Sequence, residues 1–450
     1  MKNLFGTDGI RGEAGKFPLD GPTVRIIGSS LANYLKTASG KTPSIVIGRD
    51  TRESGPWLEE ALVVGASSAG ADCLSAGVIT TPGVAYLTRI RNADAGVVIS
   101  ASHNPYHDNG IKIFAPSGRK IADTVERHIE GDIFSHSGEP FDIKVAVAPS
   151  ATETELRSSY LDFLAGEIGA GLNLAGLKLV IDCANGASAE IAPLLFQKLG
   201  AQLIAINASP DGKNINLNCG SLHIKSLQDR TVAEGADLGI AFDGDADRSL
   251  FVDSQGNFVD GDAALWVLAK QLQDHQKLKG NMVVATVMSN IGLEIAFRSR
   301  GIEMVRTDVG DKYVLEELLR RHASLGGEQS GHIIFPELSL AGDGMITSLC
   351  LLRAMIESRQ SLSGLVEGFE RYPQTLLNVR VREKVPFDQL ASVQAAVKKV
   401  EEQLSQNGRL LLRYSGTEPL ARVMIEGANQ NEIETYADRI ASEIKQEIGA

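Results

Sequence analysis

The stretch "NMVVATVMSNIGLEIAFR", residues 281–298, passes directly from one hydrophobic pattern to another. Val283 and Val284 stand in a continuous apolar run, which is typical of a strand buried on both faces of a sheet. Leu293 and Phe297 then recur at the spacing of an α-helix. A strand followed at once by a helix is the repeating unit of α/β proteins, so this stretch predicts a sheet covered by helices.

The same alternation occurs twice earlier in the chain. A strand-like run at residues 44–48 precedes a helical pattern at 56–70, and a run at 177–182 precedes a helical pattern at 187–199. These repeats indicate the α/β fold class. The chain has 450 residues, too many for one hydrophobic core, and about three or four domains are expected.

Breaks in the periodicity divide the chain. Turn-forming residues gather at 135–154, at 253–262 ("DSQGNFVDGD") and near 371–373. After the third break, the strand patterns "TLLNVRVRE", "RLLLRY" and "ARVMIEG" alternate with a long amphipathic helix and a final helix from about Glu432, which predicts a small α+β domain. We therefore expect domains at 1–150, 151–256, 257–371 and 372–450.

Composition excludes several classes of protein. The net charge of -12 argues against nucleic acid or an anionic membrane as a partner, and no stretch approaches the roughly 20 apolar residues of a membrane span. The four cysteines form no C-x-x-C pair, so neither a zinc site nor a disulfide framework is expected. The N-terminal segment has no apolar core of a signal peptide, and we expect a cytoplasmic protein. The oligomeric state stays open, a homodimer included.

Three polar loops follow predicted strands: "SASHNP" at 100–105, "FDGDADRS" at 242–249 and "GGEQSGH" at 326–332. In α/β sheets, ligands bind beyond the carboxyl ends of the strands. The positions of the three loops therefore favour a function.

The second loop carries Asp243, Asp245 and Asp247. Three crowded carboxylates repel one another unless a cation neutralises them, and oxygen ligands favour Mg²⁺ over Zn²⁺. An EF-hand is excluded because Arg248 and Ser254 stand where that loop requires glycine and glutamate. The alternatives are a magnesium site and a solvated acidic turn.

Magnesium sites often leave positions for phosphate oxygens, which suggests phosphate chemistry. A Walker loop is excluded, since Leu35 stands where "SGKT" at 39–42 would need its first glycine. The C-terminal segment "RYSGTEPLAR", 413–422, instead combines a Ser-Gly-Thr turn with two arginines, which together can bind an anion. The alternative is an ordinary β-turn.

Ser102 lies in the first loop without the G-x-S-x-G pattern of a hydrolase nucleophile. It is better suited to accept a phosphoryl group, whose charge near -2 a metal would offset. His103 and Lys112 are close enough in sequence to balance that charge or to move protons. The alternative is that Ser102 and Asn104 only shape a turn before Pro105.

Taken together, these loops resemble the α-D-phosphohexomutase superfamily, and within it most closely the bacterial phosphoglucosamine mutases. The resemblance spans the whole chain. Its segments are FGTDGIRG at 5–12, IGRDTRESG at 47–55, ISASHNPYHDNGIKIF at 99–114, DCANGA at 182–187, NINLNCGS at 214–221, FDGDADR at 242–248, VGDKYV at 309–314, GGEQSGH at 326–332 and RYSGTEPLARVMIEG at 413–427.

The resemblance implies three related α/β domains and a C-terminal α+β domain around a central active-site cleft. It implies that Ser102 is a phosphoserine and that Mg²⁺ is held by the three aspartates and a phosphoserine oxygen, with Arg248 beside them. Glu328 and Ser330 match the family's sugar contacts. The residues that match its clamp on the phosphate that is not transferred are Arg413, Ser415, Gly416, Thr417 and Arg422.

The implied reaction interconverts glucosamine 6-phosphate and glucosamine 1-phosphate, a precursor of cell-wall amino sugars, through a sugar 1,6-bisphosphate. Arg11, Lys112 and His332 occupy positions associated with the active centre. Lys112 is our choice for the general base, because arginine is a poor base at its usual pKa and His332 could equally be a structural loop residue. Gln329 favours the phosphoglucosamine branch, and Asp308, where many relatives are basic, receives no binding role.

Three alternatives remain at this point. A phosphomannomutase or phosphoglucomutase of the same superfamily would differ in its preferred sugar. A Mg²⁺-dependent sugar phosphatase would release inorganic phosphate without an isomerised product. A noncatalytic sugar-phosphate sensor would bind its ligand without turnover or phosphoserine.

Overall fold

The structure, a computed structural model, describes residues 4–136, 151–415 and 418–450. The chain forms two compact units. One consists of Met1–Met288 with Val305–Val366, and the other of Ser289–Met304 with Glu367–Ala450.

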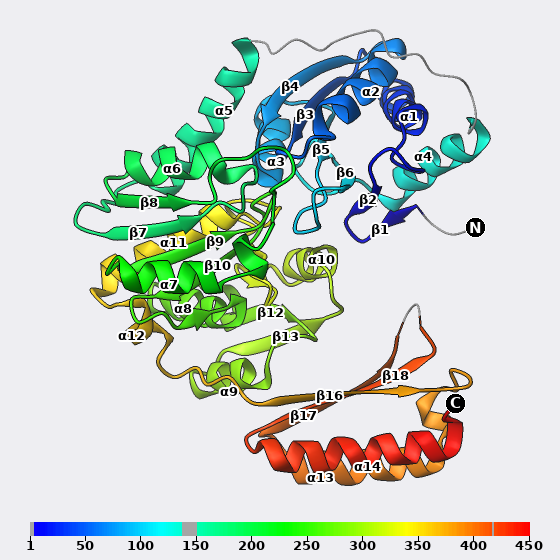
Figure 1. The fold of residues 1–450 in the computed structure, drawn as a ribbon, viewed down its shortest axis with the longest axis vertical. Helices are drawn as coiled ribbons and strands as arrows, with labels where there is room; N and C mark the ends of the chain where they lie inside the picture. The colour runs from blue at the N-terminus through cyan, green and yellow to red at the C-terminus, as the bar shows by residue number, and fades with distance from the viewer. Residues whose placement is uncertain (1–3, 137–150, 416–417) are drawn as a thin grey trace. The chain divides into compact units, whose positions relative to one another are not determined.

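The first sheet of the larger unit has six strands in the order β1-β2-β6-β5-β3-β4 (Figure 1). Its centre is parallel, since β3 pairs in parallel with β4 and β5, whereas β6, β2 and β1 extend it with antiparallel pairs. The strands are β1 (Phe5–Gly6), β2 (Gly9–Glu13), β3 (Ser44–Arg49), β4 (Asp72–Val78), β5 (Ala95–Ile99) and β6 (Asp108–Phe114).

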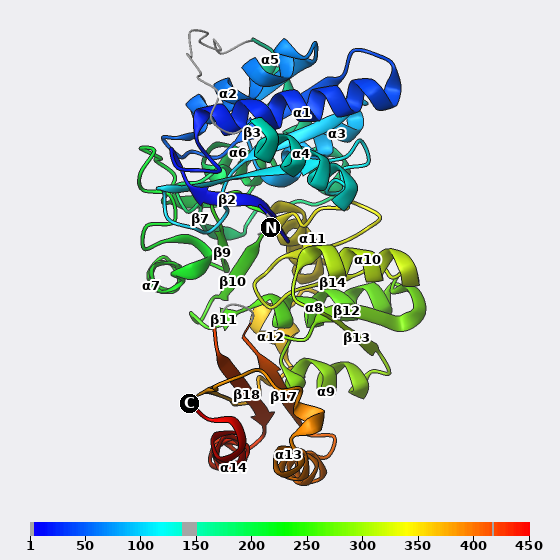
Figure 2. The same ribbon diagram turned by 90° about the vertical axis from the view of Figure 1, so that its right-hand side faces the viewer.

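Helices cover both faces of this sheet. On one face, α1, α2 and α4 bury Ile45, Ile47, Val97 and Ile99 in a common core, and Figure 2 shows α1 running across the strands. On the other face Gly48 and Gly96 let α3 approach the strands closely. The helices are α1 (Gly21–Ser39), α2 (Gly55–Ser68), α3 (Thr81–Ile90) and α4 (Asp123–His136).

The second sheet repeats this plan with the order β11-β10-β9-β7-β8. β7 pairs in parallel with β8 and β9, and antiparallel strands β10 and β11 extend the sheet beyond β9. The strands are β7 (Lys178–Asp182), β8 (Gln202–Ile206), β9 (Leu238–Phe242), β10 (Ser249–Asp253) and β11 (Phe258–Val259), and the helices are α5 (Ala151–Phe163), a π-helical turn (Leu164–Ile168), α6 (Ser188–Lys198), a 3₁₀ turn (Gly220–Leu222) and α7 (Lys225–Ala233).

The third sheet has four strands in the order β13-β12-β14-β15, with β14 parallel to β12 and antiparallel to β15. Its strands are β12 (Met282–Thr286), β13 (Glu303–Thr307), β14 (Gly326–Gly327) and β15 (Ile333–Ile334). The neighbouring helical segments are α8 (Gly261–Asp274), a 3₁₀ turn (Lys279–Asn281), α10 (Asp311–Arg321), α11 (Gly344–Ser358) and α12 (Leu362–Val366), whereas α9 (Ile291–Ser299) belongs to the smaller unit.

The smaller unit contains an antiparallel sheet in the order β16-β18-β17. Val393, Val400, Ile433 and Ile440 bury the apolar faces of two long helices in its core. The elements are β16 (Gln374–Arg380), a 3₁₀ turn (Phe387–Gln389), α13 (Ala391–Leu404), β17 (Gly408–Tyr414), β18 (Leu420–Gly427) and α14 (Gln430–Ile448).

The predicted fold class, three α/β domains with a C-terminal α+β domain, is confirmed. The predicted strand–helix pairs also form, as β3–α2, β7–α6 and β12–α9. The four cysteines are free thiols. Within the described part of the chain, no helix has the length and hydropathy needed to cross a membrane.

Regular elements reach into two of the predicted breaks in periodicity. Helix α4 continues to His136 and α5 begins at Ala151, so both ends of the segment 135–154 are helical, and residues 137–150 lie outside the described residues. The segment 253–262 includes β11, which pairs with β10 of the second sheet. Turn-forming residues therefore do not by themselves mark where an element ends, and the domain boundaries stay predictions.

Candidate active site

The three polar loops do follow strands of the three sheets, as expected. Ser102 follows β5, Asp243 follows β9, and Glu328 follows β14. In the larger unit the first two loops meet, because the Ser102 hydroxyl donates a hydrogen bond to Asp243 Oδ2 at 2.6 Å. The third loop joins them through His332, whose Nδ1 lies 3.6 Å from Asp247 Oδ2. Residues 141 positions apart in sequence thus form one site.

Ser102 has a backbone conformation that is rare for serine. Its φ is 53°, in the left-handed region, which costs about 1–2 kcal/mol for residues other than glycine. The side chain is also buried, with 1% of the residue exposed. The surrounding structure must hold this conformation, as is common at functional sites.

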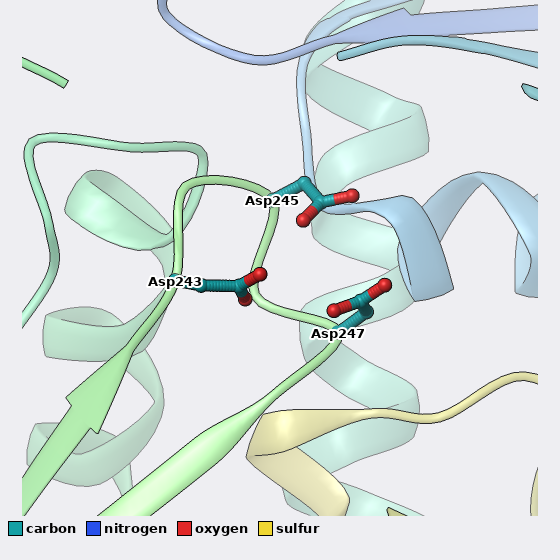
Figure 3. Close-up of side chains that lie close together, drawn as sticks. All are labelled: Asp243, Asp245 and Asp247. Atoms are coloured by element: carbon teal, nitrogen blue, oxygen red, sulfur yellow. The ribbon is translucent and has the colours of Figure 1, made fainter. Parts of the chain in front are cut away.

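The three aspartates form a compact cluster. One carboxylate oxygen from each lies within 4.8 Å of those of the other two, and all three residues are buried. Figure 3 shows the carboxylates of Asp243, Asp245 and Asp247 converging from the loop between β9 and β10. Burial, followed by the charges of Asp247 and Asp245, raises the pKa of Asp243 well above its usual range.

The donor atoms of this cluster fit a divalent cation. Oδ1 of Asp245 and Oδ1 of Asp247 are buried and accept no hydrogen bond from the described residues. A buried oxygen without a partner is costly, whereas Mg²⁺ is bound by such carboxylate oxygens. A cation would bind the two oxygens that accept no hydrogen bond and would reduce the mutual repulsion of the carboxylates.

Lys112 lies on β6 with its ammonium group against these carboxylates. Nζ is 2.9 Å from Asp245 Oδ2, 3.0 Å from Asp8 Oδ2 and 3.5 Å from Asp247 Oδ2. Burial opposes its charge, but the three carboxylates outweigh burial and hold the pKa of Lys112 well above its usual range. In this state Lys112 can donate a proton but cannot accept one.

His332 contacts the same cluster from the loop between β14 and β15. Its Nδ1 lies 3.6 Å from Asp247 Oδ2, and its Nε2 lies 3.8 Å from Asp311 Oδ2. Burial disfavours the charged imidazole, but Asp247, Asp311 and Glu328 raise the pKa of His332 to about 9. His332 is therefore positively charged at neutral pH.

The surroundings of His103 shift its pKa in the opposite direction to that of His332. Its Nδ1 lies 3.2 Å from the Ser102 hydroxyl and 3.3 Å from Nη1 of Arg248. Burial, followed by the charges of Arg248 and Arg11, lowers the pKa of His103 to about 4. This histidine is neutral at neutral pH, and the positive charge beside Ser102 belongs to Arg248.

A cavity of about 470 Å³ opens beside this cluster in the larger unit. Its volume is within the range of sites for small molecules. Arg11 reaches it from β2 and pairs with Asp8, and Glu328 reaches it from the loop after β14. The predicted site residues that line the cavity are Arg11, His103, Asp247, Arg248, Glu328 and His332.

Two predicted residues of the third loop, Ser330 and Gln329, are not among the described residues that line the cavity. The Ser330 hydroxyl is 3.4 Å from Glu328 Oε2, so it adjoins a lining residue. Gln329 points its amide toward Asp262 Oδ2 at 3.4 Å and is not among the described residues that line the cavity.

The C-terminal loop in the smaller unit brings two arginines together. Arg413 on β17 and Arg422 on β18 are directly paired across the antiparallel strands. Like charges in this position are destabilising, which favours an anion as their partner. Nε of Arg422 is buried without a hydrogen-bond partner among the described residues. Ser415 precedes the turn, whereas Gly416 and Thr417 lie outside the described residues.

Sequence reasoning missed several residues that hold these groups in place. Asp8 binds Lys112, Thr81 donates a hydrogen bond to Asp245 Oδ2 at 2.5 Å, and Lys384 donates to the Ser415 carbonyl at 2.6 Å. Asp8 lies inside the segment FGTDGIRG, so the resemblance contained a signal for it. Thr81 and Lys384 had none, because their contacts depend on chain segments that only the fold brings together.

Comparison with known proteins gives matches along the whole chain. Residues 2–139, 158–256, 260–372 and 376–443 match the family descriptions "Phosphoglucomutase/phosphomannomutase" alpha/beta/alpha domain I, alpha/beta/alpha domain II, alpha/beta/alpha domain III and C-terminal domain, respectively. A phosphoglucosamine mutase of Solibacter usitatus is 51% identical over 450 residues, covering 100% of this chain and 99% of that protein. One of Chlamydia caviae is 44% identical over 449 residues, covering 100% and 98%.

Solved structures share the fold. A phosphoglucomutase/phosphomannomutase family protein of Burkholderia thailandensis has a TM-score of 0.79 at 24% identity, over 99% of this chain and 97% of that one. The N-acetylphosphoglucosamine mutase of Aspergillus fumigatus, solved in complex with GlcNAc-6P and magnesium, has a TM-score of 0.67 at 19% identity, over 98% and 95%. With identities of up to 51% to full-length relatives, the chain belongs to the phosphoglucosamine mutases of the phosphohexomutase superfamily.

Proposed function

We propose that this protein interconverts glucosamine 6-phosphate and glucosamine 1-phosphate, with Ser102 as the carrier of the phosphoryl group. The observation that carries the proposal is the 2.6 Å contact between the Ser102 hydroxyl and Asp243 in a buried cluster of three aspartates. A hydroxyl beside a cation site, next to a cavity of about 470 Å³, suits phosphoryl transfer to a small sugar.

In the forward direction phospho-Ser102 gives its phosphoryl group to O1 of glucosamine 6-phosphate. The bond between phosphorus and Ser102 Oγ breaks, the bond between phosphorus and O1 forms, and the O1 proton replaces the lost phosphoryl group on Oγ. The product is a 1,6-bisphosphate. The bisphosphate then reverses its orientation, and the phosphoryl group on its O6 is transferred to Ser102 Oγ in exchange for the proton of that hydroxyl. This step leaves glucosamine 1-phosphate and restores the phosphoenzyme.

Asp243, Asp245 and Asp247 would hold Mg²⁺, together with an oxygen of phospho-Ser102. When bound, Mg²⁺ offsets negative charge on the transferring group and so lowers the barrier. Arg248, whose Nη1 lies 3.3 Å from His103 Nδ1 beside Ser102, adds positive charge at the same place. Its forked donors suit the oxygens of a phosphoryl group.

Arg11, Lys112 and His332 bring further positive charge to the site. Each lies within reach of a carboxylate of the cluster or of Asp8. We assign them electrostatic stabilisation of the transferring group, and Lys112 also the delivery of a proton to Ser102 Oγ. The group that removes the proton of the sugar hydroxyl stays a prediction. Our first choice is Lys112, which can act as this base only after it has given up its own proton.

A second phosphate site is needed because the bisphosphate must be bound in both orientations. We assign the phosphate that is not transferred to the C-terminal loop, with Arg413, Ser415, Gly416, Thr417 and Arg422 as its ligands. The paired arginines support this assignment, since an anion would relieve their repulsion. Glu328 and Ser330 would bind hydroxyl groups of the sugar. A sugar 1,6-bisphosphate would then serve both as intermediate and as activator.

A comparison of substrates tests this proposal most sharply. Initial rates are measured with glucosamine 6-phosphate, glucose 6-phosphate and mannose 6-phosphate under the same conditions, with Mg²⁺ and a sugar 1,6-bisphosphate present. We expect the highest kcat/KM with glucosamine 6-phosphate. A clear preference for glucose or mannose would overturn the assigned substrate, and steady release of inorganic phosphate without an isomerised product would instead indicate a phosphatase.

A further inference from the structure

An ion pair that the proposed reaction does not use lies beside the Ser102 loop. Asp50 and Arg52 follow β3, and both side chains are fully buried, with Nε of Arg52 2.8 Å from Asp50 Oδ2. A buried ion pair is often no more stabilising than apolar residues of the same size. Stability alone therefore does not account for this pair.

The Arg52 guanidinium binds the backbone of the Ser102 loop. Its Nη2 donates to the carbonyls of Ser102 at 3.0 Å and Asn104 at 2.8 Å, and its Nη1 donates to those of Asp108 at 2.9 Å and Pro105. With the bond to Asp50, these contacts use all five N–H groups that a guanidinium offers. One buried cation thus fixes four carbonyls between Ser102 and the first residue of β6.

The same ion pair also fixes the amide of Ser102. Ser102 N–H donates to Ser100 Oγ at 2.9 Å, and Ser100 Oγ donates to Asp50 Oδ2 at 2.6 Å. The amide of Ser102 is therefore linked to Asp50, and its carbonyl is bound by Arg52. Both backbone groups that set the left-handed φ of Ser102 depend on this pair.

Asn216, in the loop between β8 and α7, binds the Ser102 loop from the second α/β domain. Its Nδ2 donates to the carbonyl of Ser102 at 2.9 Å and to that of Asn104 at 3.1 Å. These are two of the carbonyls that Arg52 binds. Next to them Gly244 approaches closely, since a Cβ there would lie 2.5 Å from the Ser102 carbonyl oxygen.

We infer that Arg52 and Asn216 are positioning residues that hold the Ser102 hydroxyl against the aspartate cluster for phosphoryl transfer. This inference rests on the proposed function of Ser102. Transfer requires the Ser102 oxygen, the phosphorus and the attacking oxygen to be in line, and a misplacement of about 1 Å can cost 100-fold in rate. Neither Arg52 nor Asn216 is among the described residues that line the cavity, and both act through the Ser102 backbone.

The first test is Arg52→Lys, which keeps the positive charge beside Asp50 but loses the fork that spans four carbonyls. We expect kcat to fall by about 10- to 100-fold, while KM for glucosamine 6-phosphate stays within about twofold. Arg353→Lys is the matched control, because Arg353 also binds two carbonyls, of Ile168 and Ala170, away from the Ser102 loop. That variant should keep the kcat of the wild type.

The second test is Asn216→Gly, which removes both hydrogen bonds but tolerates the φ of 59° at this position. We expect kcat to fall by about tenfold with KM unchanged. Asn218→Gly is its control, since Asn218 is exposed in the same loop at a φ of 53°. Asn216→Gly leaves the buried ion pair of Asp50 and Arg52 intact. It therefore tests whether contacts to the Ser102 backbone position the hydroxyl, even if Arg52→Lys does not fold.

The outcomes separate this inference from the proposed function. A loss of kcat in Asn216→Gly, with normal KM and a normal Asn218→Gly control, supports positioning. Wild-type kcat in Asn216→Gly, or an equal loss in its control, overturns it while the mutase proposal stands. A wild-type protein with neither mutase turnover nor phosphoserine overturns both.

Discussion

The two regions that we assign to phosphate differ in how their charges are paired. Around Ser102 the charged groups are buried and contact one another, as in the 2.9 Å pair of Lys112 with Asp245. In the C-terminal loop Arg413 is exposed, and Arg422 has Glu418 at 3.7 Å as its ion-pair partner. A preorganised, buried site suits the chemical step, whereas weakly paired arginines suit reversible binding of an anion.

The largest effect is expected from Ser102→Ala, which removes the proposed carrier of the phosphoryl group. Mutase turnover should fall by at least about 1,000-fold, as for other covalent catalytic residues. The measurement is the initial rate with glucosamine 6-phosphate. Ser135→Ala on α4 is the control, because this exposed serine donates its hydrogen bond to the Gly131 carbonyl of its own helix. Wild-type turnover in Ser102→Ala would show that Ser102 in the buried site does not carry the phosphoryl group.

The next effect concerns the cation at the buried site. Asp245→Asn should reduce kcat by about 100-fold, because a metal ion contributes several kcal/mol to stabilisation of the transition state. Titration calorimetry with Mg²⁺ alone should show correspondingly weaker binding. Asp229→Asn on α7, an exposed aspartate that pairs with Lys225, should change neither quantity. Unchanged Mg²⁺ affinity in Asp245→Asn would argue against the three-aspartate site.

A smaller effect, on binding, is expected from Arg422→Ala in the C-terminal loop. Loss of a charge-assisted hydrogen bond should raise KM for glucosamine 6-phosphate by about tenfold, with a smaller change in kcat. Steady-state kinetics measure the two separately. Arg439→Ala on α14, whose guanidinium contacts Gln403, is the control in the same unit. A fall in kcat at constant KM would contradict the assignment of substrate binding to the C-terminal loop and of the chemical step to the site around Ser102.

The smallest effect is on stability. Arg413→Gln removes one of two like charges that face each other across β17 and β18, so the C-terminal unit should gain about 0.2–1 kcal/mol in free energy of unfolding. Denaturant unfolding measures this gain. Inorganic phosphate should stabilise the wild type more than the variant. A less stable Arg413→Gln, with an unchanged phosphate effect, would show that the arginines are not an anion site.

Much of the site was predictable because its parts follow strands. Ser102 and Asp243 follow strands whose apolar runs are plain in the sequence, and ligands of α/β proteins bind beyond the carboxyl ends of such strands. The two strands belong to different sheets, so the contact between their loops was not predictable in this way. The strand–helix pairs were also predictable, because apolar residues recur at a different spacing in a strand than in a helix.

Other features depend on contacts that no local pattern contains. Arg52 and the Ser102 carbonyl are 50 positions apart, and Asn216 is 114 positions from it. The charge of Lys112 likewise depends on Asp8, Asp245 and Asp247, which come from two other segments. Only the fold shows that Lys112, our choice for the general base, is held protonated in this state.

The central claim, that Ser102 carries the phosphoryl group, is tested most directly by mass. Intact-mass analysis and peptide mapping are applied to the wild type and to Ser102→Ala after incubation with a sugar 1,6-bisphosphate. The account predicts one added phosphoryl group, on the wild-type peptide that contains Ser102, which is transferred to added glucosamine 6-phosphate within one turnover. A fully active wild type without this group, or with the group on another residue, would contradict it.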